Sequence, residues 1–164
     1  MVHDPERHHR HSIRLQNYPY HLSGMYSVTI CTSQKQEVLG HIQNGTMKLG
    51  HVGEIVMAEW EDLPQRFPNV GLDEYVVMPN HFHAIVIILP DADCPAPTLG
   101  TIVGAFKSMS VRAVRSQIGE DSYRIWQRNY YEQIVRTDAM LEGLRRYIRD
   151  NPAHWLTDPE NTPP

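Results

Sequence analysis

Cysteine is scarce in this chain, with two residues among 164. Cys31 falls in a strand pattern and Cys94 in a proline-rich loop, and their positions show neither metal-ligand spacing nor a disulfide framework. We therefore interpret Cys31 as a small core residue and Cys94 as an incidental loop thiol. A chain of this length can bury the core of one domain without disulfides or a structural metal.

Long apolar runs are also missing. No stretch approaches the roughly 18 apolar residues of a transmembrane helix, and the polar, histidine-rich residues 1–23 lack the apolar region of a signal peptide. We therefore expect a cytoplasmic protein with no membrane partner. Residues 1–23 are interpreted as a basic, histidine-rich arm or as a disordered leader. Residues 24–155 are expected to form the folded domain and residues 156–164 a flexible tail.

The chain has no net positive charge, since the formal sum is −4 at pH 7. The charge is nevertheless uneven: residues 31–100 hold 3 Lys+Arg against 9 Asp+Glu, whereas residues 101–150 hold 9 against 6, a balance of +3 (9 − 6). A local basic face is what contacts phosphates, so the acidic total argues against a nucleic-acid partner without excluding one. A solvated helix surface explains the same arginines equally well.

What the chain has in plenty is an alternation of strand and helix patterns. Asn44-Gly45, between two strand patterns, predicts a hairpin with a type I′ turn. Because hairpin-connected strands are interleaved with helices and no successive βαβ units occur, we predict an α+β fold, a ferredoxin-like antiparallel sheet with helices packed on one face. The predicted strands are 25–31, 38–43, 46–49, 72–78, 84–89 and 133–135, and the predicted helices are 51–63, 98–117 and 138–151.

Two histidines at the mouth of a strand are the first candidates for chemistry. His81 and His83 precede the apolar run 84–89 and are separated by one residue, so they share a face of the sheet with Cα atoms about 6.5 Å apart. This spacing allows two imidazoles to bind one metal ion if a third group arrives from elsewhere. A strand-end pair held by hydrogen bonds is the alternative.

The last predicted helix offers that third group. Tyr147 and Asn151 lie one turn apart beside its apolar stripe. If the stripe packs near the histidines, it brings them a phenol and an amide oxygen. Gly143, one turn earlier, leaves room for a substrate beside the phenol. A tyrosine at the edge of such a stripe is otherwise an ordinary amphipathic core residue.

These segments resemble a known family. Pro79-Asn80-His81-Phe82-His83 between two apolar strands is similar to the HUH motif of single-tyrosine transposases. Trp126 to Arg136, followed by Tyr147-Ile148-Arg149-Asp150-Asn151-Pro152, resembles the branch called REP-associated tyrosine transposases, and Gly24 to Thr32 fits the first strand of that branch. The resemblance covers most of residues 10–155.

The resemblance implies a site and a substrate. By this resemblance, His81, His83 and Asn151 are expected to bind a divalent metal, Mg²⁺ or Mn²⁺. Tyr147 is expected to attack single-stranded DNA beside a palindromic hairpin and to form a 5′-phosphotyrosine intermediate. Tyr130 and Tyr131 are rival nucleophiles in an aromatic, basic stretch that suits packing or base stacking. Seven cations are candidates for DNA contacts: Arg10, Arg14, Lys107, Arg112, Arg115, Arg124 and Arg128. For the five from Lys107 onward, a solvated surface is at least as good an explanation.

The sequence therefore predicts a single-strand DNA endonuclease and strand transferase that acts in transposition and recombination. Two other readings remain open: a domesticated module of the same fold that binds repeat DNA without cutting, and a structural domain whose histidine pair is incidental. The sequence also leaves open whether the protein is a monomer or a homodimer, and whether Tyr147 completes the site of its own chain or of a partner.

Overall fold

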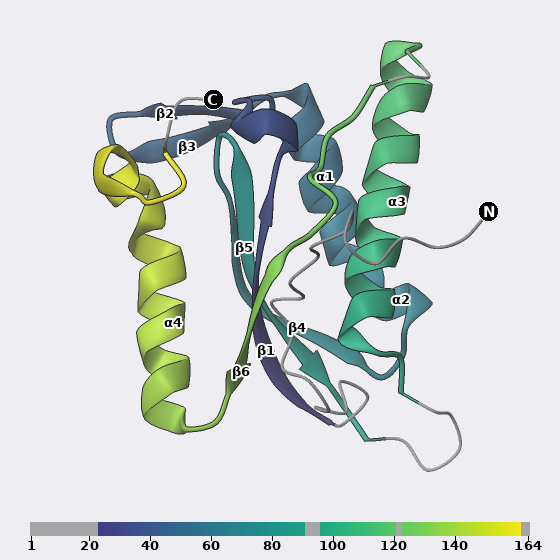
Figure 1. The fold of residues 1–164 in the computed structure, drawn as a ribbon, viewed down its shortest axis with the longest axis vertical. Coiled ribbons are helices and arrows are strands. Elements are labelled where there is room, and N and C mark those ends of the chain that lie inside the picture. The colour runs from purple at the N-terminus through teal and green to yellow at the C-terminus, as the bar shows by residue number, and fades with distance from the viewer. Residues whose placement is uncertain (1–22, 91–95, 121–122, 162–164) are drawn as a thin grey trace, which may run out of the picture.

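A computed structural model of the protein describes residues 23–90, 96–120 and 123–161 (Figure 1). The predicted arm, with Arg10 and Arg14, and the loop residue Cys94 lie outside the described residues. None of the helices within the described ranges is long and apolar enough to cross a membrane.

A four-stranded antiparallel sheet forms the centre of the molecule, in the order β4-β5-β1-β6. Its central strands, β1 (Gly24–Cys31) and β5 (His81–Ile88), pair over their full length. The edge strands are β4 (Val70–Val77) and β6 (Tyr131–Val135). This antiparallel sheet confirms the predicted α+β class. The predicted strand at 84–89 begins three residues earlier than expected, so both histidines belong to it.

The alternation of β5 divides the sheet into two faces. Phe82, Ala84 and Val86 belong to the main core, which they form with α1 (His51–Glu61) and α3 (Leu99–Ile118). Ile85 belongs to a second cluster with α4 (Asp138–Asp150). Because side chains two apart share a face, His81 and His83 lie on the α4 side.

Helices therefore cover both faces, with α4 on one side of the sheet and α1, α2 and α3 on the other (Figure 1). The expectation of helices on one face was wrong in this respect. The reason is that β5 is apolar on both faces, while α4 has an apolar stripe of Leu141, Leu144 and Ile148 that must also be buried.

The ends of the helices follow ordinary capping rules. The side chain of Thr98 caps α3 by accepting from the Thr101 N–H, and Gly119 ends it in the left-handed conformation (φ 71°). Thr137 is the N-cap of α4 and accepts a hydrogen bond from the Met140 N–H through its side chain. The helix predicted at 51–63 ends at Glu61, because Pro64 lies in the first turn of a further short helix, α2 (Leu63–Arg66).

The predicted hairpin is confirmed as β2 (Gly40–Gln43) and β3 (Thr46–Leu49). Asn44 and Gly45 both have positive φ angles, 52° and 70°, as a type I′ turn requires. The turn packs against Ala153 of the 3₁₀ helix Asn151–Thr157, which follows α4 directly. The hairpin thus supports the chain beyond α4.

The chain after residue 155 differs from the flexible tail that the sequence predicted. The 3₁₀ helix crosses that boundary, and Asp158 is buried beyond it. Asn161 donates a hydrogen bond to the Trp155 carbonyl (2.8 Å). As far as Asn161, the chain is therefore packed onto the domain, close to the two histidines.

Candidate active site

The two histidines of β5 are buried side by side, with ring centroids 4.5 Å apart. The Nδ1 atom of each ring has a hydrogen-bond partner at 2.8 Å: the Oδ1 of Asn80 for His81, and the Oγ1 of Thr29 for His83. Thr29 stands directly across from His83 in β1. Both rings therefore use Nδ1 for support and leave Nε2 for other partners, as metal-binding histidines do.

The protonation of His81 follows from its neighbours. The side-chain amide nitrogen of Asn80 donates to the Glu160 carbonyl (2.9 Å), so the oxygen of that amide faces His81 and accepts from Nδ1–H. The lone pair of His81 is then on Nε2. This atom is fully buried and has no hydrogen-bond partner among the described residues.

Helix α4 brings the predicted tyrosine to this pair. The Oη of Tyr147 lies 3.4 Å from the Nε2 of His83, and the two rings meet edge to face with centroids 5.2 Å apart. Asn151, one turn later, is buried, and its Oδ1 has no hydrogen-bond partner within the described part of the chain. The structure thus brings together all four residues predicted for catalysis and metal binding, within one chain.

Burial sets the charge state of these groups. It lowers the pKa of His81 to about 2 and that of His83 to about 4, so both imidazoles are neutral at pH 7. Burial also raises the pKa of the Tyr147 phenol, and the nearby carboxylate of Asp158 adds to this, while Asn151 acts in the opposite direction. Neutral imidazoles are the form that binds a metal, and the phenol needs help to lose its proton.

Asp158 is the residue that sequence reasoning missed. Its Oδ2 lies 3.9 Å from the Nε2 of His81, and one ligand atom from each of His81, His83 and Asp158 lies within 4.8 Å of the others. No periodic pattern marks this aspartate, because it follows α4 in a short polar segment that the sequence analysis took as a tail. Only the folding of that segment back over β5 reveals it.

The donor atoms suit a divalent ion. Unpaired buried atoms such as the Nε2 of His81 and the Oδ1 of Asn151 are unfavourable unless something binds them. Two imidazole nitrogens with amide and carboxylate oxygens form a mixed set that first-row ions such as Mn²⁺ accept. The residues present therefore fit the metal that the sequence predicted.

Open space lies on both sides of Tyr147. A hollow of about 510 Å³ reaches from Tyr147 and His83 to Thr29 of β1 and Tyr131 of β6. A second hollow, of about 400 Å³, lies along α4 and includes Gly143, where an added Cβ would meet nothing within 4 Å. The room predicted beside Gly143 is present.

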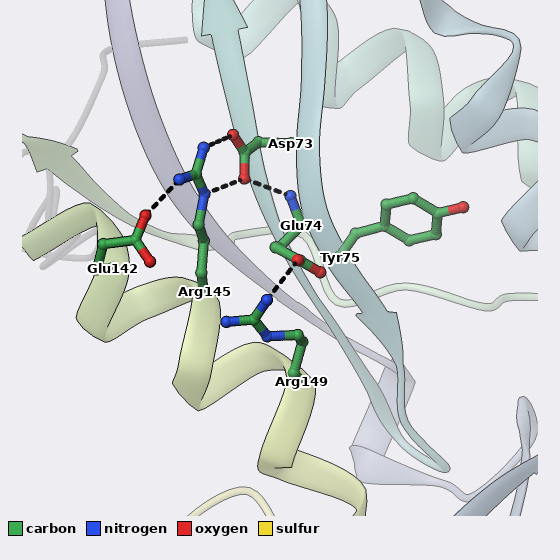
Figure 2. A pocket seen from close by; sticks show the side chains of 6 residues that line it. All are labelled: Asp73, Glu74, Tyr75, Glu142, Arg145 and Arg149. Carbon is green, nitrogen blue, oxygen red and sulfur yellow. Dashed lines mark hydrogen bonds and ion pairs between the residues drawn. The ribbon is translucent and has the colours of Figure 1, made fainter. Parts of the chain in front are cut away.

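Ion pairs fix α4 to the sheet (Figure 2). Asp73 accepts two hydrogen bonds from Arg145, at 2.8 and 2.6 Å, and Glu74 pairs with Arg149 at 3.3 Å. The register of β4 shifts between Leu72 and Tyr75, and this irregularity lets two consecutive side chains face the same helix. We call these two pairs the α4 clamp; its arginines precede and follow Tyr147 by two residues.

A separate basic groove of about 340 Å³ lies between α3 and the segment before β6. No carboxylate from the described residues lines this basic groove. Five predicted DNA contacts line it together: Lys107, Arg112, Arg115, Arg124 and Arg128.

Lys107 has a structural role in this groove. Its ammonium donates to the carbonyls of Gln127 (2.9 Å), Arg128 (3.4 Å) and Asn129 (2.9 Å) and lies 5.5 Å from the ring centre of Tyr130. An ammonium group has three donors, and all are used here. Burial lowers the pKa of Lys107 to about 8. Lys107 therefore holds residues 127–129 against α3, a role that its charge alone does not predict.

The antiparallel sheet, the histidine pair on its central strand and the helical tyrosine that faces this pair are the features that the resemblance to single-tyrosine transposases implies. The chain belongs to the family of IS200-like transposases, since the family model described as "Transposase IS200 like" matches residues 63–151, more than half of its length.

Individual proteins share the sequence or the fold of this chain. A Haemophilus influenzae protein described as uncharacterized is 38% identical over 168 residues, which is 92% of each chain. A REP-associated tyrosine transposase, solved bound to a REP hairpin, has the same fold with a TM-score of 0.61 at 18% identity, over 85% of this chain and 73% of that one. A candidate transposase from Deinococcus radiodurans has a TM-score of 0.54 at 16% identity, over 85% of this chain and 97% of that one.

Proposed function

We propose that the protein is a metal-dependent single-strand DNA endonuclease and strand transferase that acts beside hairpin DNA. One observation carries the proposal: the Oη of Tyr147 lies 3.4 Å from the Nε2 of His83 in the same chain. A phenol held against a buried histidine pair is a nucleophile next to a cation site. Membership of the IS200-like transposase family and the fold of a hairpin-bound relative support the choice of DNA as substrate.

The divalent ion would be held by His81, His83 and Asn151, through the two Nε2 atoms and the amide oxygen. When bound, such an ion supplies Lewis acidity toward a phosphate oxygen and compensates charge that grows during the reaction. The residues around the two imidazoles keep them neutral, oriented and shielded from water. The Nδ1–H of His81 donates to the Oδ1 of Asn80 and the Nδ1 of His83 is hydrogen-bonded to the Oγ1 of Thr29, which orients both rings, while burial keeps them neutral.

Tyr147 would attack in line. Its Oη forms a bond to phosphorus while the bond from phosphorus to the 3′ oxygen breaks; the phenol loses its proton, and the leaving oxygen takes one to become a 3′-OH. The product is a 5′-phosphotyrosine. Since the phosphodiester energy is kept in this linkage, a 3′-OH can attack it and rejoin strands by the same steps in reverse.

The basic groove gives the DNA a path to this site. Arg128 lines the groove and Tyr131 lines the hollow beside Tyr147, and three residues span at most about 10 Å. Phosphates bound by the groove arginines would thus lie near the strand that enters the hollow. The remaining predicted contacts, Arg10 and Arg14, stay proposals for the arm.

The test uses labelled hairpin DNA with a single-stranded flank, incubated with the full chain and Mn²⁺. Tyr147→Phe should abolish the covalent protein–DNA adduct. Tyr131→Phe is the matched control, because this half-exposed phenol lines the same hollow; the adduct should persist.

An adduct that survives in Tyr147→Phe and disappears in Tyr131→Phe would assign the nucleophile to Tyr131. Tight hairpin binding with no product under any divalent ion would favour the non-cutting module.

A further inference from the structure

We propose that Asp158 is an additional ligand of the divalent ion, delivered by residues 152–161, which we call the C-terminal strap. The inference rests on the metal site proposed above and adds a residue that lies outside the family-matched segment 63–151. Its starting point is the grouping of Asp158 with His81 and His83, all buried, with one ligand atom of each within 4.8 Å of the others.

A bound cation would stabilise the Asp158 carboxylate in its buried surroundings. Its side chain is 1% exposed, and the group facing its Oδ2 is the Nε2 of His81 at 3.9 Å, whose proton lies on the opposite ring nitrogen. Among the described residues, no lysine or arginine forms an ion pair with Asp158. A buried carboxylate is unfavourable unless a hydrogen bond or a positive charge compensates it. The Asp158 carboxylate accepts one described hydrogen bond, on Oδ1 from the Glu160 N–H (2.6 Å), so within the described residues it has a hydrogen bond but no positive charge beside it.

A fourth ligand of this kind changes the chemistry of the site. Two imidazoles and one amide form a neutral set, whereas Asp158 adds a carboxylate oxygen and a full negative charge. Carboxylates are the preferred ligands of hard divalent ions and raise affinity with each added charge. With this fourth ligand, we expect the site to bind the ion in the absence of DNA.

The strap is anchored firmly enough to hold a ligand in place. The carboxylate of Glu160 pairs with Lys35 at 3.1 Å and accepts from the Cys31 thiol at 3.3 Å, at the end of β1. Trp155 is buried, with its ring centre 6.0 Å from that of His81. These contacts seat the strap on the sheet and over the histidine.

One residue of the strap also links Asp158 to the orientation of His81. The Glu160 carbonyl accepts from the amide of Asn80, which thereby turns its oxygen toward the Nδ1–H of His81. The Glu160 N–H meanwhile holds the Asp158 carboxylate. The backbone carbonyl of Glu160 therefore fixes which ring nitrogen of His81 is free, and its N–H fixes the position of the Asp158 carboxylate.

The experiment measures Mn²⁺ binding to the full chain in the absence of DNA, by the loss of the free-ion signal in electron paramagnetic resonance. Asp158→Asn should weaken the affinity on the order of 10-fold or more, and His81→Ala should weaken it at least as much. Asp150→Asn is the control, because it removes one carboxylate from the exposed end of α4; its affinity should equal that of the wild type.

A second readout does not depend on titrating the ion. Saturating Mn²⁺ should raise the midpoint of thermal unfolding of the wild type more than that of Asp158→Asn, because the ion stabilises the folded state that binds it. Equal Mn²⁺ affinity and equal thermal shift for Asp158→Asn and wild type, with binding lost in His81→Ala, would overturn the role of Asp158 and leave the proposed metal site intact. Unchanged binding in His81→Ala would overturn the metal site itself.

Discussion

The cations of the basic groove can be divided by experiment into those that contact DNA, as proposed, and those that stabilise the fold. We compare Arg128→Gln with Lys107→Met. Arg128 is exposed in the groove, and its guanidinium has no described partner, whereas the ammonium of Lys107 is bonded to three carbonyls. We expect the first variant to weaken DNA binding and the second to weaken the fold.

The size of the effect follows from the number of arginines in the groove. Four line it: Arg112, Arg115, Arg124 and Arg128. If each neutralises one phosphate, they contribute about −3.6 to the slope of log K against log salt, so a fourfold rise in salt weakens binding about 150-fold through them. Loss of one contact reduces this contribution to about −2.7, or about 40-fold. Lys107→Met should leave the slope unchanged and cost about 2 kcal/mol of folding stability.

The assay is fluorescence anisotropy with a labelled hairpin at four salt concentrations, combined with urea unfolding of each variant. Arg66→Gln serves as a charge-matched control, because Arg66 lies on α2 and pairs with Asp62 at 3.0 Å. An Arg128→Gln slope equal to that of the wild type, or a Lys107→Met slope as shallow as that expected for Arg128→Gln, would refute the division of roles.

Two further predictions concern the supports of the site. The hydrogen bonds from Arg145 hold the pKa of Asp73 below its usual 3.8, so the α4 clamp contributes fully above that pH, and its contribution falls as the pH drops through the lowered value. Asp73→Asn should thus unfold more easily than the wild type at pH 7, and the gap should close in acid; a gap that widens in acid contradicts this reasoning. The Oγ of Ser110 accepts from the Trp126 indole at 2.9 Å, so Ser110→Ala should cost about 1–3 kcal/mol in urea unfolding, and a neutral effect would show that the indole finds another partner.

The parts of the site that lie on regular elements could be predicted from the sequence. Alternation along a strand puts His81 and His83 on one face, and the period of a helix puts Tyr147 and Asn151 one turn apart. Both relations are local. The packing of α4 over the histidines was a condition of the prediction, because an apolar stripe shows that a helix face is buried but not where; the structure places α4 there.

The remaining parts depend on contacts between distant segments. Nothing near Asp158 in the sequence indicates that it meets His81, because that contact requires the strap to fold back over β5. Lys107 was expected to bind phosphates because a sequence shows its charge but not the carbonyls that occupy it. The α4 clamp depends on an irregularity in β4, and strand patterns do not show where such an irregularity falls.

The α4 clamp bears on how many polypeptides make one site. Arg136 and Thr137 alone separate β6 from α4, and a connection of that length reaches only about 10 Å. Exchange of α4 with a second chain would require breaking both ion pairs with Asp73 and Glu74 and also separating β6 from β1. In the arrangement seen, Tyr147 and the two histidines belong to a single molecule. If the proposed cleavage takes place there, its rate per molecule should not change when the protein is diluted.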